Sequence, residues 1–373
     1  MQKTRIVIAS ILKPVTDTRA CFRFGFSLRE TNKYEINIIG FSGKKENPID
    51  GIDFHPIFSK KRNHPSRLLA PWKFLWKIRQ IKPQLLIVST YELLPFSVLG
   101  KWIWGYKLVY DVQENYLLNI GQNRTLEGIK KRLAAWGIKL FESGSKPWID
   151  HFILAESCYR KELPGFKPAT VLENKFYGPV QKNASCIIGP NQAIRFLISG
   201  TVTEVYGVLE GIRWFVEFQK NHGKAHLHVL GHCPMDAFAK RILPEVRPQI
   251  MTVDLSPIPI GYGKILDAYA NANVVLLPYW QIPSIRDKMP SKLYEAIGMG
   301  KIVLHSPNPK WENFASKYQA GMAVDFRNTS AIPTIIKQLN SQTFFAQGPD
   351  DSLGWQSEQG TFLKLVSSLT LPN

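Results

Sequence analysis

Short apolar runs rich in β-branched residues recur along the whole chain, and stretches with helical spacing of apolar residues separate them. This alternation is typical of parallel α/β sheets, in which a helix returns the chain between neighbouring strands. We predict strands at 5–10, 35–41, 85–90, 107–112, 151–156 and 169–174 in the first half, and at 194–199, 226–231, 273–279 and 301–306 in the second. Helices are predicted at 18–30, around Trp72 and at 124–143.

A stretch rich in Gly, Pro and Asn, at about 177–194, divides these strands into two sets. The chain has 373 residues, which is enough for two domains of ordinary size. We therefore predict an α/β fold with two doubly wound, Rossmann-like domains that face each other across a cleft, with ligands outside the carboxyl ends of the strands. The predicted parts are an N-terminal acceptor-side domain at 1–180, a linker at 181–194, a C-terminal nucleotide-sugar-binding domain at 195–345, and a terminal helix at 346–373 that packs back across the junction.

Positive charge is concentrated in the first half of the chain. Residues 1–182 contain 30 Lys and Arg against 15 Asp and Glu, and the rest contain 17 against 14, within a formal net charge of +18. Such a basic half indicates a polyanionic partner, which could be nucleic acid, an anionic membrane surface or a phosphorylated substrate.

The sharpest concentration of basic residues is the stretch 60–84, which contains no Asp or Glu. Trp72 and Trp76 alternate there with Lys73 and Lys77 at helical spacing. This pattern is typical of an amphipathic helix that lies on a membrane surface. A helix that faces a protein core and exposes a basic side to solvent explains it equally well. The sequence leaves both interpretations open.

The four cysteines are scattered and form no Cys-x-x-Cys pair. A disulfide framework or a metal clip is therefore not expected, and a reducing compartment is. The first ten residues have the pattern of a strand rather than a signal peptide, and no run approaches the roughly 18–20 apolar residues that cross a bilayer. We expect a cytoplasmic protein, with any membrane contact at the inner face of the membrane.

The segment DKMPSKLYEAIGMGKIVLHS, at 287–306, combines a short helix with the strand that follows it. Pro290 suits the first helical position because it lacks the N–H that would be unpaired there. Lys292 and Glu295 are then three residues apart on one face of the helix, near its positive end. Here a carboxylate can accept two ribose hydroxyls, while a lysine and free amides can bind a diphosphate. An exposed Lys–Glu pair worth a few tenths of a kcal/mol is the simpler explanation of the same pattern.

A second candidate ligand-binding segment is SGTVTEVYGVLEGIRWF, at 199–215, where a strand ends and a helix begins. Gly200 permits a tight turn, and Gly207 lies near the start of the helix. The backbone amides of this loop, with the hydroxyls of Thr201 and Thr203, could hold a phosphate. An ordinary turn from strand to helix fits the residues equally well.

Asp287, seven further residues and Glu295 precede the strand sequence GKIVL. This arrangement resembles the donor-binding segment of retaining glycosyltransferases with the GT-B fold, of the kind grouped as glycosyltransferase family 4-like, or glycosyl transferases group 1. In that family an acidic residue, seven others and a glutamate precede a Gly-x-Pro-Val-Ile strand. The similarity also includes YGKILDAYANANVVLLPY, DTRACFRFGFSLRE, LVYDVQENY and SGTVTEVYGV, so it covers most of the chain.

The resemblance implies a role for each matched residue. Glu295 would hold the donor ribose, Lys292 the diphosphate, and Asp287 would lie near the transferred sugar. The residues implied to line the acceptor-side wall are Asp17, Arg19, Asp111 and Glu114. The residues implied to act in catalysis are Asp287, Glu295, Lys292, Glu114 and Arg19. The residues implied to bind the donor are Gly200, Thr201, Thr203, Lys288, Ser291, Lys292 and Glu295.

Four positions depart from the family pattern. Many relatives carry an arginine where this chain has Thr201 and a lysine where it has Tyr206. Gln113 stands in place of a common histidine, and Asp287 in place of the first glutamate of the acidic pair. Lys292 is therefore expected to supply most of the phosphate-binding charge. The other candidate cations are Lys288, Arg286 and Arg19.

No metal ion is expected at the donor site, because the sequence has no Asp-x-Asp motif to bridge a metal and a diphosphate. His226 and His228 lie on one face of a predicted strand, but no carboxylate stands at ligand spacing, so we interpret them as structural. The nucleotide-diphosphate sugar is expected as a co-substrate, with no further cofactor.

These features predict a hexosyltransferase that moves a sugar from a nucleotide-sugar donor to a glycan or lipid-linked acceptor, in cell-envelope or exopolysaccharide synthesis. Lys292 and the helix amides would stabilise negative charge on the departing diphosphate, and the resemblance implies retention of anomeric configuration. Two alternatives stay open: a sugar-nucleotide epimerase with the same fold, and a non-catalytic protein whose basic half binds a membrane or nucleic acid. Nucleic acid is the less expected partner, because RNA-binding modules bring aromatic stacking motifs that this sequence lacks.

Overall fold

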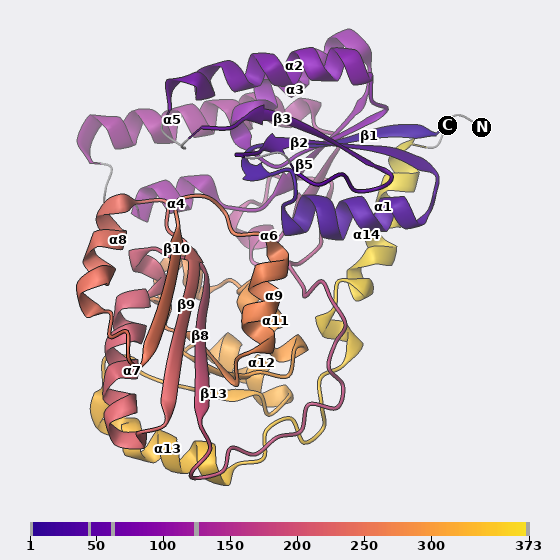
Figure 1. Cartoon of the computed structure of the whole chain (residues 1–373). Coiled ribbons are helices and arrows are strands. Elements are labelled where there is room, and N and C mark those ends of the chain that lie inside the picture. Colours follow the sequence, from indigo (N-terminus) through magenta and orange to yellow (C-terminus); the bar gives the residue numbers. More distant parts are fainter. Residues whose placement is uncertain (1–2, 44–45, 61–63, 123–126, 371–373) are drawn as a thin grey trace. The chain divides into compact units, whose positions relative to one another are not determined.

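The chain folds into two compact units, which are Met1–Asn174 together with Glu358–Asn373, and Lys175–Ser357 (Figure 1). The structure is a computed structural model, and it describes residues 3–43, 46–60, 64–122 and 127–370. In the described part, no helix is both long enough and apolar enough to cross a membrane.

The N-terminal unit is built on a seven-stranded parallel sheet in the order β3-β2-β1-β4-β5-β6-β7. Its strands are β1 (Thr4–Pro14), β2 (Tyr34–Phe41), β3 (Ile52–Phe58), β4 (Leu85–Val88), β5 (Lys107–Val112), β6 (His151–Leu154) and β7 (Ala169–Val171). Its helices are η1 (Thr18–Gly25), α1 (Phe26–Glu30), η2 (Pro65–Leu69), α2 (Ala70–Ile81), η3 (Tyr91–Leu93), α3 (Leu94–Trp104), α4 (Tyr116–Gln122), α5 (Gly128–Ser145), η4 (Lys146–Trp148), α6 (Tyr159–Glu162) and α14 (Gln356–Thr370).

The C-terminal unit has a six-stranded parallel sheet in the order β10-β9-β8-β11-β12-β13. Its strands are β8 (Ile194–Thr201), β9 (Ala225–His232), β10 (Met251–Ser256), β11 (Val274–Leu277), β12 (Ile302–His305) and β13 (Gly321–Ala323). Its helices are η5 (Glu204–Tyr206), α7 (Val208–His222), α8 (Asp236–Ile242), η6 (Leu243–Glu245), α9 (Tyr262–Ala270), α10 (Pro283–Arg286), α11 (Ser291–Gly298), α12 (Pro309–Lys317), η7 (Thr329–Ala331), α13 (Ile332–Ser341) and η8 (Asp351–Leu353).

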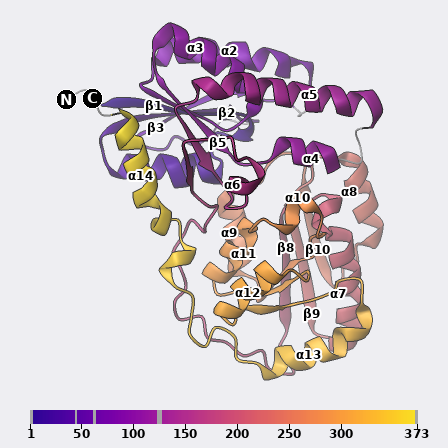
Figure 2. The same cartoon turned by 180° about the vertical axis from the view of Figure 1, so that it is seen from behind.

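Helices cover both faces of each sheet. In the N-terminal unit, α2, α3 and α5 lie on one face and α1 with α14 on the other (Figure 1). In the C-terminal unit, α7 and α8 lie on one face and α9, α11 and α12 on the other (Figure 2). The strands between them are almost wholly buried, as β4, β11 and β12 show. Two doubly wound α/β units are therefore present, and the predicted fold class is confirmed.

Each predicted strand is present, but β3, β10 and β13 were missed. All three lie at the edge of a sheet, where one side of the strand is open to solvent. Their sequences consequently mix apolar and polar residues, as in IDFHPIF and MTVDLS, or are very short. A search for continuous apolar runs finds central strands and overlooks edges of this kind.

The helix predictions hold with shifted boundaries. The predicted helix at 18–30 is a π-helical turn, η1, that continues into α1, and the basic segment around Trp72 is α2. The helix predicted at 124–143 is observed as α5, while positions 124–126 lie outside the described residues. The terminal helix α14 places Phe362 against Phe24, with ring centroids 4.4 Å apart and the rings stacked.

The packing of α5 on the sheet buries one carboxyl group, that of Glu142. The hydroxyl of Tyr110, a fully buried residue of β5, donates a hydrogen bond to Glu142 Oε1 at 2.9 Å. Burial raises the pKa of Glu142 to about 7, and the hydrogen bond from Tyr110 offsets part of this effect. The folded protein therefore holds a proton on Glu142 up to a higher pH than the unfolded chain does.

We expect the substitution Glu142→Gln to remove a loss of stability that the parent protein shows as the pH rises. A carboxyl group whose pKa is raised in the folded state favours folding below its unfolded pKa and loses that advantage as the pH rises through the folded pKa. From pH 4.5 to pH 8 the free energy of unfolding of the parent should fall by about 3 kcal/mol relative to that of Glu142→Gln. Urea unfolding at a series of pH values measures it. Glu127→Gln, at the exposed start of the same helix, controls for the loss of one carboxylate, and equal profiles for all three proteins would contradict the prediction.

Candidate functional site

The strand order places one point of each sheet where ligands of doubly wound folds bind. In the C-terminal unit the order reverses between β8 and β11, which pair in parallel. At such a switch point the connections after the two strands leave in opposite directions and open a crevice at their carboxyl ends. Gly200 is the second-last residue of β8, and the connection after β11 leads to α11 with Lys292 and Glu295. Two segments that the sequence singled out separately thus meet at one edge of the sheet.

Gly200 directly contacts the side chain of Lys292. It adopts a φ of +110°, which L residues with a side chain rarely do. A Cβ atom at this position would lie 2.8 Å from Lys292 Cε and 3.9 Å from its Nζ. The lysine stem therefore lies against bare backbone at the end of β8, and glycine is required for this approach.

Gly207 lies against Pro278, the residue that directly follows β11. Its φ of +61° is left-handed, and an added Cβ would lie 1.8 Å from the carbonyl oxygen of Pro278. Gly207 also precedes α7 at the N-cap position, so this close approach sets where the helix starts. The loop from Gly200 to Gly207 is therefore fixed at both ends by glycines with positive φ.

Lys292 and Glu295 form an ion pair on the first turn of α11. Lys292 Nζ lies 2.7 Å from Glu295 Oε2, and the two side chains are 15% and 4% exposed. This is not the exposed surface pair that the simpler explanation assumed, because the carboxylate is almost fully removed from water. Pro290 is the N-cap residue rather than the first helical residue, since α11 begins at Ser291. Pro290 makes no side-chain hydrogen bond to the first-turn amides, so the N-cap side chain does not compete with a ligand for them.

Two buried tyrosines lie around Glu295. Burial, with a smaller contribution from Glu295, raises the pKa of Tyr269 well above its ordinary value. Burial also raises the pKa of Tyr279, whose ring centroid lies 4.7 Å from that of Tyr206. Both phenols therefore stay protonated and can serve as hydrogen-bond donors near the carboxylate. Tyr206 packs against the ring of Tyr279, at the position where the family resemblance led us to expect a lysine.

The hydroxyl residues predicted to bind the donor lie at the same edge of the sheet. Thr201 is the exposed last residue of β8, and Ser291 is the first residue of α11. Thr203 Oγ1 is buried and has no hydrogen-bond partner within the described residues. A buried hydroxyl without a partner is uncommon in folded proteins, and a bound ligand is one way to satisfy it.

Asp287 and Lys288 lie in the turn between α10 and α11. The Asp287 carboxylate is exposed and lies 3.3 Å from Nε of Arg286, and its backbone oxygen accepts a hydrogen bond from Lys310 Nζ at 3.0 Å. The backbone oxygen of Lys288 accepts one from Trp311 Nε1 at 2.8 Å. In this structure Asp287 is thus paired with its neighbour in sequence, and its place beside a transferred sugar stays a prediction.

Asn308 fixes this turn and was missed from the sequence. Its side chain is buried, its Oδ1 caps α12, and its Nδ2 donates to Gln281 Oε1 at 2.6 Å and to the backbone oxygen of Arg286 at 2.8 Å. The signal was present, because Asn followed by Pro after a strand is a typical helix start.

His305 is a second residue near this site that the sequence did not single out. It lies fully buried at the carboxyl end of β12, and its Nε2 has no partner within the described residues. Burial lowers the pKa of His305, which favours the neutral imidazole.

In the N-terminal unit, where the strand order reverses between β1 and β4, a buried ion pair joins the helical turn after β1 to β5. Arg19, from η1, binds Asp111, from β5, through Nε at 3.0 Å to both carboxylate oxygens and through a terminal nitrogen at 2.7 Å to Oδ1. The other terminal nitrogen of Arg19 donates to the backbone oxygen of Leu172 at 2.9 Å and to Asn174 Oδ1 at 3.1 Å. Both charged side chains are almost completely buried, so protein atoms already use the arginine's donors.

The other predicted residues of this unit surround that pair. Asp17 caps η1 by accepting hydrogen bonds from the amides of Arg19 and Ala20. Gln113 Nε2 donates to Asp111 Oδ2 at 2.6 Å, at the position where the family resemblance led us to expect a histidine. Glu114 is exposed and accepts a hydrogen bond from Asn119 Nδ2 at 3.1 Å. Of these residues Glu114 is the one whose carboxylate is open to solvent, and its catalytic role stays a prediction.

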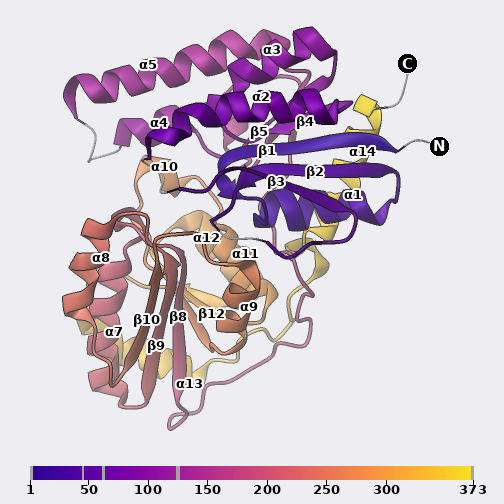
Figure 3. The same cartoon turned by 45° about the horizontal axis from the view of Figure 1, so that its top comes forward.

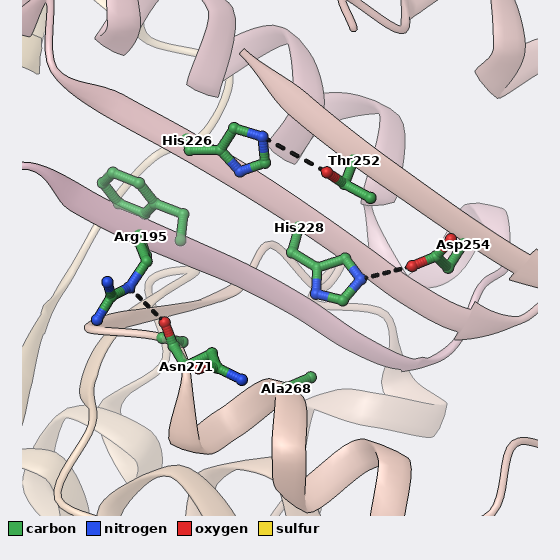
Figure 4. Close-up of a pocket in the computed structure, with 9 residues that line it drawn as sticks. Arg195, His226, His228, Thr252, Asp254, Ala268 and Asn271 are labelled. Carbon is green, nitrogen blue, oxygen red and sulfur yellow. Dashed lines mark hydrogen bonds and ion pairs between the residues drawn. The ribbon is translucent and has the colours of Figure 1, made fainter. Parts of the chain in front are cut away.

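A separate cavity of about 270 Å³ lies near the amino ends of β8, β9 and β10, with α9 beside it (Figure 4). His228 Nε2 lies 2.9 Å from Asp254 Oδ2, and Arg195 Nε donates to the backbone oxygen of Asn271 at 2.6 Å. Its polar groups are therefore engaged with one another. It lies at the opposite end of the strands from Gly200, so it is not the edge at which ligands of this fold bind.

No protein-family model and no curated protein sequence matches the chain. Several solved structures do match the chain. Sucrose-phosphate synthase from Thermosynechococcus elongatus aligns with a TM-score of 0.68 and 13% identity over 98% of this chain and 99% of that one. HepE from Anabaena, in complex with UDP and glucose, aligns with a TM-score of 0.67 and 10% identity over 98% and 100%. A putative UDP-N-acetylglucosamine 2-epimerase from Listeria monocytogenes aligns with a TM-score of 0.58 and 11% identity over 99% and 96%.

These similarities establish the fold over nearly the whole length of the chain. The two parallel α/β units correspond to the Rossmann-like domains of glycosyltransferases with the GT-B fold. At identities this low, function does not follow from the fold, because one fold supports many activities. The activity has to be argued from the residues at the switch points.

Proposed function

We propose that this protein is a glycosyltransferase that moves a sugar from a nucleotide-diphosphate donor to a glycan or lipid-linked acceptor. The observation that carries the proposal is the buried Lys292–Glu295 pair, which lies against Gly200 at the switch point of the C-terminal unit. A structural ion pair gains little from burial, because desolvation costs as much as the attraction returns. A cation and a carboxylate that bind a ligand in common explain why both charges are kept there.

The proposed chemistry is electrostatic. When the bond between the sugar and the diphosphate breaks, negative charge develops on the leaving phosphate. Lys292 and the amides at the start of α11 are positioned to stabilise that charge without reorganising. Glu295 would accept hydrogen bonds from the donor ribose, and Thr203 Oγ1 would gain the partner it lacks among the described residues. The retaining outcome is part of the proposal through the family resemblance alone.

The structural neighbours support this activity. HepE was solved with UDP and glucose, and sucrose-phosphate synthase is by name an enzyme that joins sugars. We propose UDP as the first nucleotide to test on that basis. For the acceptor we propose a component of cell-envelope or exopolysaccharide synthesis, handled on the cytoplasmic side of the membrane.

A sugar-nucleotide epimerase is the second candidate, because the Listeria monocytogenes protein has the same fold over 99% of this chain. The two activities differ in what they consume. An epimerase converts the donor in the absence of any acceptor, whereas a transferase gives slow hydrolysis at most. Incubation of the protein with a nucleotide sugar alone, followed by chromatography of the products, separates them.

Thermal unfolding with a panel of nucleoside diphosphates tests the donor site. A ligand that binds the native state at 100 times its dissociation constant stabilises it by about 2.7 kcal/mol, which raises the Tm of a domain of this size by about 5–10 °C. We expect one nucleoside diphosphate to give such a shift and Glu295→Ala to abolish it. The matched control is Glu217→Ala, which removes the carboxylate of an exposed Lys–Glu pair on α7. If no nucleotide raises the Tm, or Glu295→Ala responds as the parent does, the donor site is wrongly assigned.

A further inference from the structure

Helix α5 carries a row of large apolar side chains on its exposed side. Ile129, Leu133, Trp136 and Leu140 are 74%, 62%, 64% and 49% exposed. Their spacing of four, three and four residues places them on one stripe along about three turns. The buried residues of the helix, Ile138, Glu142 and Ser145, lie at other positions. The core is therefore satisfied without the stripe, whose four side chains are left largely exposed among the described residues of the N-terminal unit.

Helices α2 and α3 continue this apolar surface. Helix α3 packs against both α5 and α2, and all three helices lie on the same face of the sheet (Figure 3). Trp72 and Trp76 are exposed on α2, and Trp102 and Ile103 on α3. Trp102 packs edge to face against the exposed Trp148 of η4, with ring centroids 4.9 Å apart. We call the surface formed by these exposed side chains of α2, α3, α5 and η4 the tryptophan face.

Monomeric proteins rarely leave an apolar surface of this extent open to water, so it marks an interaction site. The sequence had drawn attention to α2. It did not reveal that α5 presents a second stripe or that the two helices share a face, because that neighbourhood is a product of the fold.

The charges around the tryptophan face identify its partner. Lys73 and Arg79 are exposed on α2, and Lys130, Arg132 and Lys139 are exposed on α5 beside the apolar stripe. Tryptophan, leucine and isoleucine flanked by lysine and arginine are the composition of helices that lie at the surface of an anionic bilayer. A complementary protein surface would have to be both apolar and strongly acidic. Anionic lipid supplies both properties at once, because its headgroups meet the cations while its acyl chains accept the tryptophans.

We propose that the tryptophan face is a membrane-docking surface, on which α2, α3 and α5 lie flat against a bilayer that contains anionic lipid. The lysines and arginines contact the lipid headgroups, and the exposed Trp, Leu and Ile side chains enter the boundary between headgroups and acyl chains. The surface belongs to the N-terminal unit and is built from residues other than those of the proposed donor site. It stands or falls independently of the enzymatic activity.

Co-sedimentation of the full-length protein with vesicles tests this assignment. We expect binding to vesicles of phosphatidylcholine with 30% phosphatidylglycerol and much weaker binding to pure phosphatidylcholine. The triple variant Ile129→Ser, Leu133→Ser, Trp136→Ser should bind anionic vesicles about tenfold more weakly or worse. The variant Lys130→Gln, Arg132→Gln, Lys139→Gln should lose a similar factor, because each cation near the surface contributes. High salt should weaken vesicle binding by the parent about as much as the loss of the three cations does, because it screens charges. It should leave most of the contribution of the apolar side chains.

The controls use the C-terminal unit. Leu243→Ser with Ile258→Ser removes two exposed apolar side chains, and Lys240→Gln with Lys264→Gln removes two exposed cations. Both should bind vesicles as the parent does, and circular dichroism should show all variants folded. Binding that ignores anionic lipid, or that survives the triple substitution, would overturn the proposal. A second set of results would also overturn it: the parent is a dimer in light scattering, the triple variant is a monomer, and neither protein binds vesicles. The tryptophan face would then hold a second copy of the chain.

Discussion

Replacement of Arg19 by methionine is expected to lower the free energy of unfolding of the N-terminal unit by about 3–5 kcal/mol, because it leaves the Asp111 carboxylate buried without its cation. Leu172 and Asn174 would each lose a donor as well. The double variant Arg19→Met, Asp111→Leu removes the stranded charge and should recover part of the loss. The pair therefore acts on the structure of this unit, whatever else Arg19 does.

Amide hydrogen exchange measures this effect within one unit at a time, which a single melting temperature of a two-unit protein does not. Amides of β1 and β5 should exchange faster in Arg19→Met, while those of β8 and β11 should not change. Arg213→Met breaks an exposed pair with Glu245 and should cost less than 1 kcal/mol. If Arg19→Met keeps the protection of the parent and loses transferase activity, the catalytic role implied by the family resemblance is the correct one.

The pattern of the sequence was sufficient for the central strands of each sheet and for the edge strand β7, and insufficient at the other edges. Strands β4, β11 and β12 are buried on both faces, so their sequences are nearly pure apolar runs. Strands β3 and β10 have one open side, so their composition approaches that of loops. Burial thus determines both the sequence signal and its absence.

The site shows a similar division. The spacing of Lys292 and Glu295 placed them on one helical face, and the structure agrees. The spacing gave no information about burial, and the Lys292 side chain lies against Gly200, from a strand 92 residues earlier in the chain. For Arg19 the sequence showed a charged residue at the start of a predicted helix, and its bidentate contact with Asp111 depends on the pairing of β1, β4 and β5. Contacts between distant segments decide whether a charged residue is free to bind a ligand or already paired.

Lys292 and Glu295 should affect the reaction in different ways, and this separates a donor site from a structural pair. Lys292→Ala is expected to lower the rate of sugar transfer by about 10²- to 10³-fold, because it removes charge from the leaving diphosphate. Glu295→Gln should weaken nucleotide binding about 10- to 100-fold, the value of hydrogen bonds to a charged group. Single-turnover kinetics and nucleotide titration measure the two quantities. Either single change also unbalances a buried pair, so folding has to be followed in parallel.

The double variant Lys292→Met, Glu295→Gln distinguishes the two roles. It removes both buried charges together, so it should fold nearly as well as the parent. If the pair serves the fold alone, this variant will bind nucleotide and transfer sugar normally. If the pair holds the donor, the double variant will be stable and inactive. The single variant Lys292→Arg will then transfer sugar faster than Lys292→Ala, because arginine keeps a cation at the site. Lys220→Ala, in the exposed pair on α7, should leave stability, nucleotide binding and rate unchanged. A stable double variant with full activity would contradict the donor site at its central residues.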